Sequence, residues 1–389
     1  MRCAKRFGTN WMMIVPKAST KEGARQRWVI KLGSALLSHE EGGLNRPLIA
    51  SLAGVCVQLR DQGIDPVLVS SGAISQGMTR LGWKGRPHEL HQLQVAAAVG
   101  QMGLIRAYQG AFEKYGVQTA QVLLTSADLN NRNRYLNARS ALRSMLELGI
   151  VPVVNENDTV VTEEIQFGDN DSLGALVGNL VEADYLVILT DQEGLYQADP
   201  RHDPAAELVR QASAGDPLLE EYAGPSGALG RGGMLTKLQA AAKAARSGAS
   251  TIICSGRSPE ALLGVPRGDI PGTFLKAASG RMAARKLWLA GRMQSRGRVF
   301  IDDGACRVLM DSGKSLLPVG VTRVEGDFQR GDLVDCLAEE GHRLVARGLA
   351  NYSAEETAKI AGQSSLRIEA CLGYVDEPEL IHRDNMVLA

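Results

Sequence analysis

Two lysine residues stand beside glycines in a pattern that suits the binding of phosphate. Lys31 ends an apolar run and is followed closely by Gly33 and Ser34. Glycine lets backbone N–H groups approach an anion, and lysine adds a mobile positive charge. Lys237 ends the glycine-rich segment 229–237, LGRGGMLTK, whose spacing differs from that of a Walker A motif. For Lys31 by itself, a buried or ion-paired structural lysine explains the pattern equally well.

A second glycine turn follows the apolar segment 66–70. It reads Ser71-Gly72-Ala73 and leads into a helical pattern. The free backbone N–H groups at the start of a helix bind anions, so a carboxylate or a phosphate would fit here. A plain turn between a strand and a helix is an equally good interpretation of these residues alone.

Two clusters of carboxylates and amides follow further along the chain. The first is 155–158, NEND, and the second is 168–171, GDND, which starts a helical pattern. An ammonium group needs carboxylate partners and a carboxylate needs N–H donors, so the two clusters together predict an amino-acid site. Asp171 has an alternative interpretation, as an acidic residue that stabilises the N-terminus of a helix.

The combination of these motifs indicates phosphoryl transfer. Two lysines, two glycine-rich anion loops and an acid-rich segment suit a reaction that needs positioning and charge neutralisation more than covalent catalysis. Thr190 and Asp191 follow another apolar run and would suit a nucleotide ribose or base. No Ser-His-Asp or Cys-His arrangement competes, because none of the six histidines lies in these motifs.

The elements that would position these motifs alternate between strand and helix. Several predicted strands are continuous apolar runs, as a parallel sheet covered on both faces requires. Ligands bind such sheets beyond the carboxyl ends of the strands, where the motifs lie. We therefore expect residues 26–276 to form a three-layer α/β/α sandwich with a mainly parallel sheet. Its predicted strands are 28–32, 66–70, 117–124, 151–154, 185–190 and 250–254, and its helices 45–63, 89–114, 134–148, 172–181 and 235–247.

The pattern changes near residue 277. Residues 277–298 hold six basic and no acidic residues, which we interpret as a solvated linking helix. Short strand patterns separated by glycine turns then predict a small β-rich barrel. The predicted organisation is an irregular N-terminal extension (1–25), the α/β domain (26–276), a basic linker (277–297), the β-rich domain (298–375) and a C-terminal tail (376–389).

Composition narrows the choice of partners and compartment. Lysine plus arginine equals aspartate plus glutamate, 43 each, so nucleic acid is not the expected main partner. The region 277–389 itself holds 15 basic and 16 acidic residues. No apolar stretch approaches the ~20 residues that a membrane helix needs. The six cysteines form no CxxC pair, which predicts no metal site and a cytoplasmic, reducing environment.

Six segments resemble the glutamate 5-kinases, a branch of the amino acid kinase family, in order and in spacing. They are WVIKLGSALL, SSGAISQGM, VPVVNENDTV, FGDNDSLGALV, LVILTDQEGLY and GRGGMLTKLQAA. The resemblance covers residues 27–276, and the β-rich region resembles a PUA domain, which gives an RNA-binding association at the level of the domain only. The family's glycine loop usually reads GTGGM. Here Arg231 replaces the threonine and retains the ability to contact phosphate.

The resemblance implies a role for each matching residue. Lys31 and Lys237 would hold the ATP phosphates, and Asp171 would orient both lysines. Backbone N–H groups of Gly33, Ser34 and Gly72 would contact the phosphoryl group and the reacting carboxylate. The implied glutamate site comprises Ser71, Gly72, Ala73, Asn155, Asp158, Asp169 and Asn170. The implied ATP site adds Thr190, Asp191, Arg231, Gly232, Gly233, Met234, Leu235 and Thr236.

The resemblance also implies an activity and partners. The implied reaction transfers the γ-phosphoryl group of ATP to the side-chain carboxylate of L-glutamate, with Mg²⁺, in the first step of proline biosynthesis. Proline would act as a feedback inhibitor at the glutamate site. The chain would form a homo-oligomer, a dimer or a tetramer. Its product would pass to glutamate-5-semialdehyde dehydrogenase.

Overall fold

The computed structural model describes residues 25–38, 43–160, 170–223, 233–278 and 295–389. By its internal contacts the chain divides into two compact units. The first contains most of the chain up to Ala277. The second contains the residues from Ala278 onward together with Ser126–Ala141 and Arg246–Gly248. Each unit has a β-sheet of its own, so each is described by itself.

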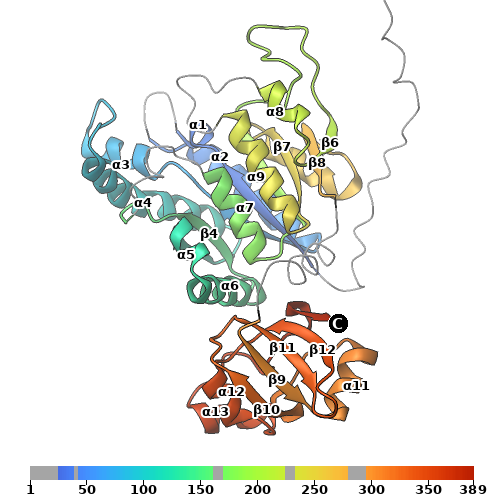
Figure 1. The fold of residues 1–389 in the computed structure, drawn as a ribbon. Helices are drawn as coiled ribbons and strands as arrows, with labels where there is room; N and C mark the ends of the chain where they lie inside the picture. Colours follow the sequence, from blue (N-terminus) through green and yellow to red (C-terminus); the bar gives the residue numbers. More distant parts are fainter. Residues whose placement is uncertain (1–24, 39–42, 161–169, 224–232, 279–294) are drawn as a thin grey trace, which may run out of the picture. The chain divides into compact units, whose positions relative to one another are not determined.

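An eight-stranded sheet forms the centre of the first unit (Figure 1). The strand order is β3-β4-β2-β1-β5-β7-β8-β6, and the strand pairs are parallel except β7 with β8. The sequence-based expectation of a mainly parallel sheet is therefore confirmed. The strands are β1 (Gln26–Leu32), β2 (Ile64–Val69), β3 (Thr119–Leu124), β4 (Val151–Glu156), β5 (Tyr185–Thr190), β6 (Gln211–Ser213), β7 (Ser250–Ser255) and β8 (Thr273–Lys276).

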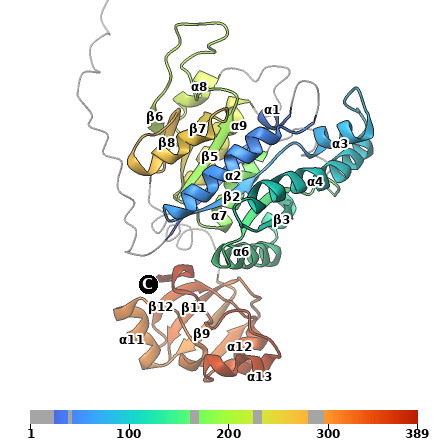
Figure 2. The same cartoon turned by 180° about the vertical axis from the view of Figure 1, so that it is seen from behind.

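Helices cover both faces of this sheet. Figure 1 shows α7 and α9 over one face, and the reverse view in Figure 2 shows α2 and α4 over the other. The central strand β1 is buried from Trp28 to Leu32 because it lies between these layers. The helices along this part of the chain are α1 (Ser34–Leu37), α2 (Arg46–Asp61), α3 (Ala73–Leu81), α4 (Leu90–Glu113), α5 (Ser126–Asn130), α6 (Arg132–Glu147), α7 (Asn170–Leu180), α8 (Leu218–Ala223) and α9 (Met234–Arg246), of which α5 and most of α6 belong to the second unit.

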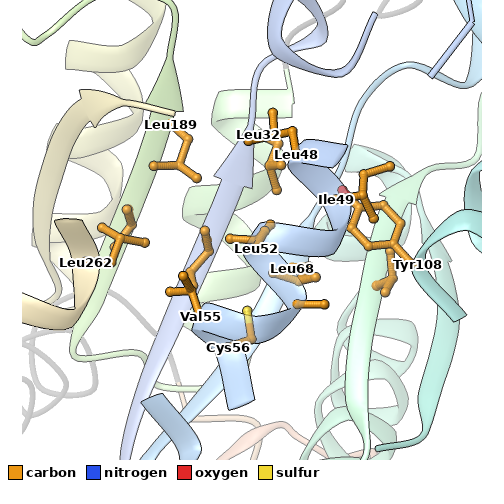
Figure 3. Packing of buried hydrophobic residues seen from close by; sticks show 14 of the residues in the cluster. Leu32, Leu48, Ile49, Leu52, Val55, Cys56, Leu68, Tyr108, Leu189 and Leu262 are labelled. Carbon is orange, nitrogen blue, oxygen red and sulfur yellow. The ribbon is translucent and has the colours of Figure 1, made fainter. Parts of the chain in front are cut away.

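Helix α2 illustrates how local signals and burial agree. The Asn45 side chain caps the helix by accepting a hydrogen bond from the Leu48 backbone N–H at 3.1 Å. Side chains at helical spacing then point into the core, where Leu52 and Cys56 lie close to Leu68 of β2 (Figure 3). Burial of each such leucine contributes roughly 1.5–3 kcal/mol. This packing holds the central strands in place beneath the site.

Helices α3 and α4 cross with their backbones almost in contact. A Cβ atom built on Gly77 of α3 would lie 1.7 Å from the carbonyl oxygen of Ala96, and one on Gly100 of α4 would lie 1.8 Å from the oxygen of Ala73. Real Cβ atoms do not approach that closely, so glycine is required at both positions. This crossing joins the start of α3, just after β2, to the middle of α4.

The second unit contains a five-stranded sheet in the order β10-β9-β11-β12-β13. Four of its strands match the strand patterns recognised in the sequence. The fifth, β13, pairs antiparallel with β12 and lies within the segment expected to be a tail. The bounds are β9 (Gly297–Ile301), β10 (Val321–Gly326), β11 (Leu333–Ala338), β12 (Leu344–Leu349) and β13 (Met386–Leu388), with helices α11 (Asp303–Ser312), α12 (Ala354–Ile360) and α13 (Ile368–Leu372).

Some elements differ from the sequence-based expectations. The short elements α1, α5, β6, β8 and β13 were not expected, because each is too short to show a period. Strand β4 runs on to Glu156, so Asn155 lies within the strand rather than after it. The basic linking helix lies largely outside the described residues. Within the described parts of the chain, every helix is too short or too polar to cross a bilayer.

Candidate active site

The carboxyl ends of four neighbouring strands form the candidate site. Strands β4, β2, β1 and β5 are adjacent and parallel, so their carboxyl ends meet at one edge of the sheet. The motifs that follow β2, β1 and β5 therefore reach this edge from distant parts of the chain. This is the position at which open α/β sheets bind ligands.

Lys31 and Lys237 converge on a single carboxylate. The Nζ atom of Lys31 lies 2.5 Å from Oδ1 of Asp171, and the Nζ atom of Lys237 lies 3.2 Å from Oδ2. Asp171 has no exposed surface, and both lysines are buried. The three residues come from α7, β1 and α9, which local sequence does not bring together. Two ammonium groups separated by one carboxylate leave a net positive centre at the strand ends.

The electrostatics of this centre keep Asp171 ionised. Burial acts to raise the pKa of its carboxyl group, but the charges and hydrogen bonds of Lys31 and Lys237 outweigh burial and hold the pKa below its ordinary value. The hydroxyl of Thr236 also donates to Oδ2 of Asp171, at 3.0 Å. Asp171 is thus an anion at neutral pH and fixes both ammonium groups toward one point.

A chain of side-chain amides lies beside the charged centre. The Asn170 amide Nδ2 shares its hydrogens among the Ser70 carbonyl at 2.8 Å, the Ser71 hydroxyl at 2.9 Å and Oδ1 of Asn155 at 3.1 Å. The Asn155 amide Nδ2 in turn donates to Oε1 of Gln101 at 2.8 Å. All of these side chains are buried. The chain joins the end of β2, β4 and α7, which the sequence motifs suggested were near one another, to α4, which they did not.

Asp158 adds a carboxylate at the other end of the same region. Burial raises the pKa of Asp158 to about 6, and the charge of Arg86 offsets part of that rise. Asp158 and Gln101 both line a cavity of about 320 Å³, together with Glu156 and Asn157. That volume lies in the range of ~300–1,000 Å³ that is typical of small-molecule sites.

The turns after β1 and β2 differ in what they can offer a ligand. Gly72 has a φ of 96°, a left-handed conformation that favours glycine, and it starts α3 with no side-chain cap. The Gly33 backbone N–H instead donates to the carbonyl of Leu189 at 3.1 Å. The expected donation from Gly33 to a phosphate is therefore not available in this structure. Ser34 begins α1, and Ala73 begins α3.

The remaining expected site residues have different outcomes. At the end of β5, which pairs with β1, the hydroxyl of Thr190 donates to Oδ1 of Asp191 at 3.0 Å. Gly233, Met234 and Leu235 lead into α9 or form its first turn. The expected site residues outside the described part of the chain are Asp169, Arg231 and Gly232.

One residue of this network was missed from the sequence. Gln101 lies in the middle of a 24-residue helix, where the residue pattern predicts only a helix. A buried glutamine in an Ala- and Gly-rich helix face is the signal that a closer analysis would use, because such a side chain needs hydrogen-bond partners.

The described side chains contain no group of three or more His, Cys, Asp or Glu residues able to hold a metal ion. Mg²⁺ usually binds through substrate phosphates, waters and only one or two carboxylates. The donor set is therefore compatible with a magnesium ion that arrives with a nucleotide. Both oxygens of Asp171 already face ammonium groups.

This fold and site define a phosphoryl-transferring α/β domain of the amino acid kinase type. The chain belongs to the amino acid kinase family, whose model matches residues 26–255. A model for the PUA domain matches residues 297–372. The family assignment therefore covers every strand of the sheet that carries the site except β8, and the PUA match covers most of the smaller sheet.

Several relatives of high sequence identity are glutamate 5-kinases. The chain is 58% identical over 367 residues to the glutamate 5-kinase of Thioalkalivibrio sulfidiphilus, covering 94% of this chain and 98% of the relative. It is 57% identical over 363 residues to that of Chromohalobacter salexigens, covering 93% and 96%. A carbamate kinase from Giardia lamblia bound to AMP-PNP has a TM-score of 0.48 at 16% identity, over 65% of this chain and 99% of that one. That likeness is too distant to bear on the site.

Proposed function

We propose that this chain transfers the γ-phosphoryl group of ATP to the side-chain carboxylate of L-glutamate. The product would be L-glutamyl 5-phosphate, in the first step of proline biosynthesis from glutamate. One observation carries the proposal: two buried lysines meet on Asp171 at the strand ends of a chain 58% identical to a glutamate 5-kinase. The reaction needs just such a concentration of positive charge.

The two lysines would hold the phosphates and neutralise the charge that shifts during transfer. Asp171 orients both ammonium groups. Its own side chain is held in position because it is buried and accepts a hydrogen bond from Thr236. The segment 231–236 and the first turn of α9 would contact the nucleotide phosphates. Thr190, which ends β5, and Asp191, which follows it, would contact the rest of the nucleotide.

The amide chain and Asp158 would bind glutamate. Asp158 offers a carboxylate for the substrate ammonium group, and the amides of Asn155 and Asn170 offer further polar contacts. Ser71, Gly72 and Ala73 stand at the start of α3, where backbone N–H groups can meet a substrate carboxylate. Asp169 would complete the site.

The nucleophile would be the γ-carboxylate of the substrate itself. A carboxylic acid of ordinary pKa near 4.3 is already ionised at neutral pH, so the reaction requires no general base. The protein's contribution is alignment of the carboxylate with the γ-phosphorus and exclusion of water. Mg²⁺, bound through ATP phosphates, would supply further charge neutralisation when present.

Regulation and assembly follow from the same proposal. Proline is a small amino acid with the same α-carboxylate as glutamate and a positively charged secondary ammonium group, so it would compete for the same site. The chain would form a homo-oligomer, either a dimer or a tetramer. The labile acyl phosphate would be delivered to glutamate-5-semialdehyde dehydrogenase.

An acyl phosphate trap tests the reaction directly. Incubation with ATP, Mg²⁺, hydroxylamine and one acceptor at a time should give a hydroxamate with L-glutamate. ADP release, measured without hydroxylamine, should be slower by orders of magnitude with aspartate, N-acetylglutamate or UMP. Faster turnover with N-acetylglutamate or UMP than with glutamate would overturn the proposed substrate. ATP consumption without hydroxamate would overturn the acceptor group.

A further inference from the structure

Two buried polar atoms of the amide chain are left without a partner in the described residues. They are Nε2 of Gln101, a donor, and Oδ1 of Asn170, an acceptor. Gln101 is 9% exposed and Asn170 is 7% exposed. A buried polar atom without a hydrogen bond costs roughly 1–3 kcal/mol. Side chains held in that state at a sheet edge point to a ligand that completes their hydrogen bonds.

The hydrogen-bond chain determines which atom each amide presents. Asn170 uses Nδ2 for three protein acceptors, so its oxygen is the atom that remains. Gln101 uses Oε1 to accept from Asn155, so its Nε2 remains. If the Gln101 amide were flipped, its own N–H group would face the N–H group of Asn155 and this hydrogen bond would be lost. The chain therefore offers one acceptor and one donor in a defined order.

That order matches the two ends of an α-amino acid. Oδ1 of Asn170 can accept from an ammonium group, and Nε2 of Gln101 can donate to a carboxylate. Asn170 is adjacent in sequence to Asp171 of the lysine centre, whereas Gln101 is two amides further away along the chain of hydrogen bonds. Gln101 consequently stands at the end of the chain remote from phosphoryl transfer, where the non-reacting α-carboxylate belongs.

We infer that Gln101 is a specificity-determining residue that donates a hydrogen bond from Nε2 to the α-carboxylate of the bound amino acid. This inference rests on the proposed glutamate site. Gln101 lines the same cavity as Asp158, so a single amino acid there can reach both side chains. The site would thereby require a free α-carboxylate as well as a free ammonium group.

The test compares L-glutamate with its 1-amide, in which the α-carboxylate is a neutral carboxamide and the reacting carboxylate is unchanged. Gln101→Glu keeps an oxygen to accept from Asn155 but replaces the Nε2 donor with a second oxygen. The KM for glutamate should rise about 10- to 100-fold, because a charged hydrogen bond is replaced by repulsion. The KM for the 1-amide should change by much less, and the KM for ATP should not change.

Two further variants make the outcome decisive. Gln109→Glu introduces the same change two turns along the same helix, at an exposed position outside the cavity, and should leave every constant as in the wild type. Gln101→Met removes the donor without adding charge. It should produce a smaller rise in KM that is still confined to glutamate. This variant therefore tests the inference even if Gln101→Glu does not fold.

The inference is overturned if both Gln101 variants raise KM for glutamate and for its 1-amide by the same factor, because a purely structural role affects both substrates alike. It is also overturned if neither KM changes. Wild-type protein that fails to phosphorylate glutamate at all would instead refute the proposed function, so the two failures are distinguishable.

Discussion

Replacement of Asp171 with asparagine should destabilise the protein in a way that nucleotide reverses. Asparagine keeps the size of the side chain and one oxygen acceptor, but it removes the negative charge between two buried ammonium groups. Lys31 and Lys237 are then left facing each other without a counter-ion. The triphosphate of ATP would supply negative charge at the same place.

The distances set the scale of the effect. At 2.5 Å and 3.2 Å, each ion pair is worth about 5–7 kcal/mol of Coulomb attraction with an effective dielectric constant of ~20. Most of that attraction offsets the desolvation of the buried charges, so removal of one partner typically costs about 3–5 kcal/mol. In a unit of this size, 3 kcal/mol corresponds to a fall in Tm of about 6–12 °C.

Thermal melting with and without a non-hydrolysable ATP analogue measures both parts of the expectation. The variant should melt lower than the wild type without nucleotide, and saturating nucleotide should raise its Tm by more than it raises that of the wild type. Asp65→Asn is the matched control, since Asp65 pairs with the half-exposed Arg25 at 2.7 Å and should cost less than about 1 kcal/mol.

Two results would refute this reasoning. An Asp171→Asn variant that melts with the wild type in the absence of nucleotide would mean that the lysines do not depend on the carboxylate. Equal stabilisation of both proteins by nucleotide would mean that the phosphates do not reach the lysine pair.

Three further expectations follow from the site. Lys237→Ala should lower kcat by about 10²–10³ with an unchanged circular dichroism spectrum. Lys243→Ala, on the same helix, is the control and should retain activity. Comparable kcat values for the two variants would mean that Lys237 takes no part in the reaction. Burial raises the pKa of Asp158 to about 6, and only the ionised carboxylate balances an ammonium group. KM for glutamate, measured in a pH series, should therefore rise as pH falls below 6. Asp158→Asn should remove this pH dependence. Gly100→Ala should lower the free energy of unfolding, measured by chemical denaturation, by at least about 1–3 kcal/mol. Gly110 has open space around it, so Gly110→Ala should leave that free energy unchanged or raise it slightly. The opposite ranking would contradict the tight crossing of α3 and α4.

The sequence predicted the sheet and the meeting of its strand ends because both follow from long, regular patterns. Apolar runs as long as Tyr185–Thr190 are recognisable without a structure, and parallel strands necessarily direct their carboxyl ends to one edge. The location of Lys31 at that edge could be anticipated on that basis, whereas that of Lys237 could not, because Lys237 lies in the first turns of α9 and follows no strand directly. Their contact with a shared Asp171 was implied only by the family resemblance, because ion-pair geometry depends on side-chain packing between three separate elements.

What the sequence did not predict has physical causes as well. Strand β13 is three residues long and is stabilised by pairing with β12, so its own residues carry too short a period to identify it. Gln101 is a functional candidate inside a helix, where its sequence neighbours determine the helix and its hydrogen bonds depend on β4. The engagement of the Gly33 N–H with Leu189 is likewise a contact between distant segments.

The crossing of α3 over α4 has a consequence for how substrate preference can change. With Gly77 and Gly100 in place, the separation of the two helices is determined by main-chain atoms, which mutation of the pocket lining does not alter. Gln101, one residue after Gly100, can therefore be exchanged to change recognition without altering the packing of α4 against α3. Evolution or design could explore new amino-acid substrates here without first rebuilding the scaffold.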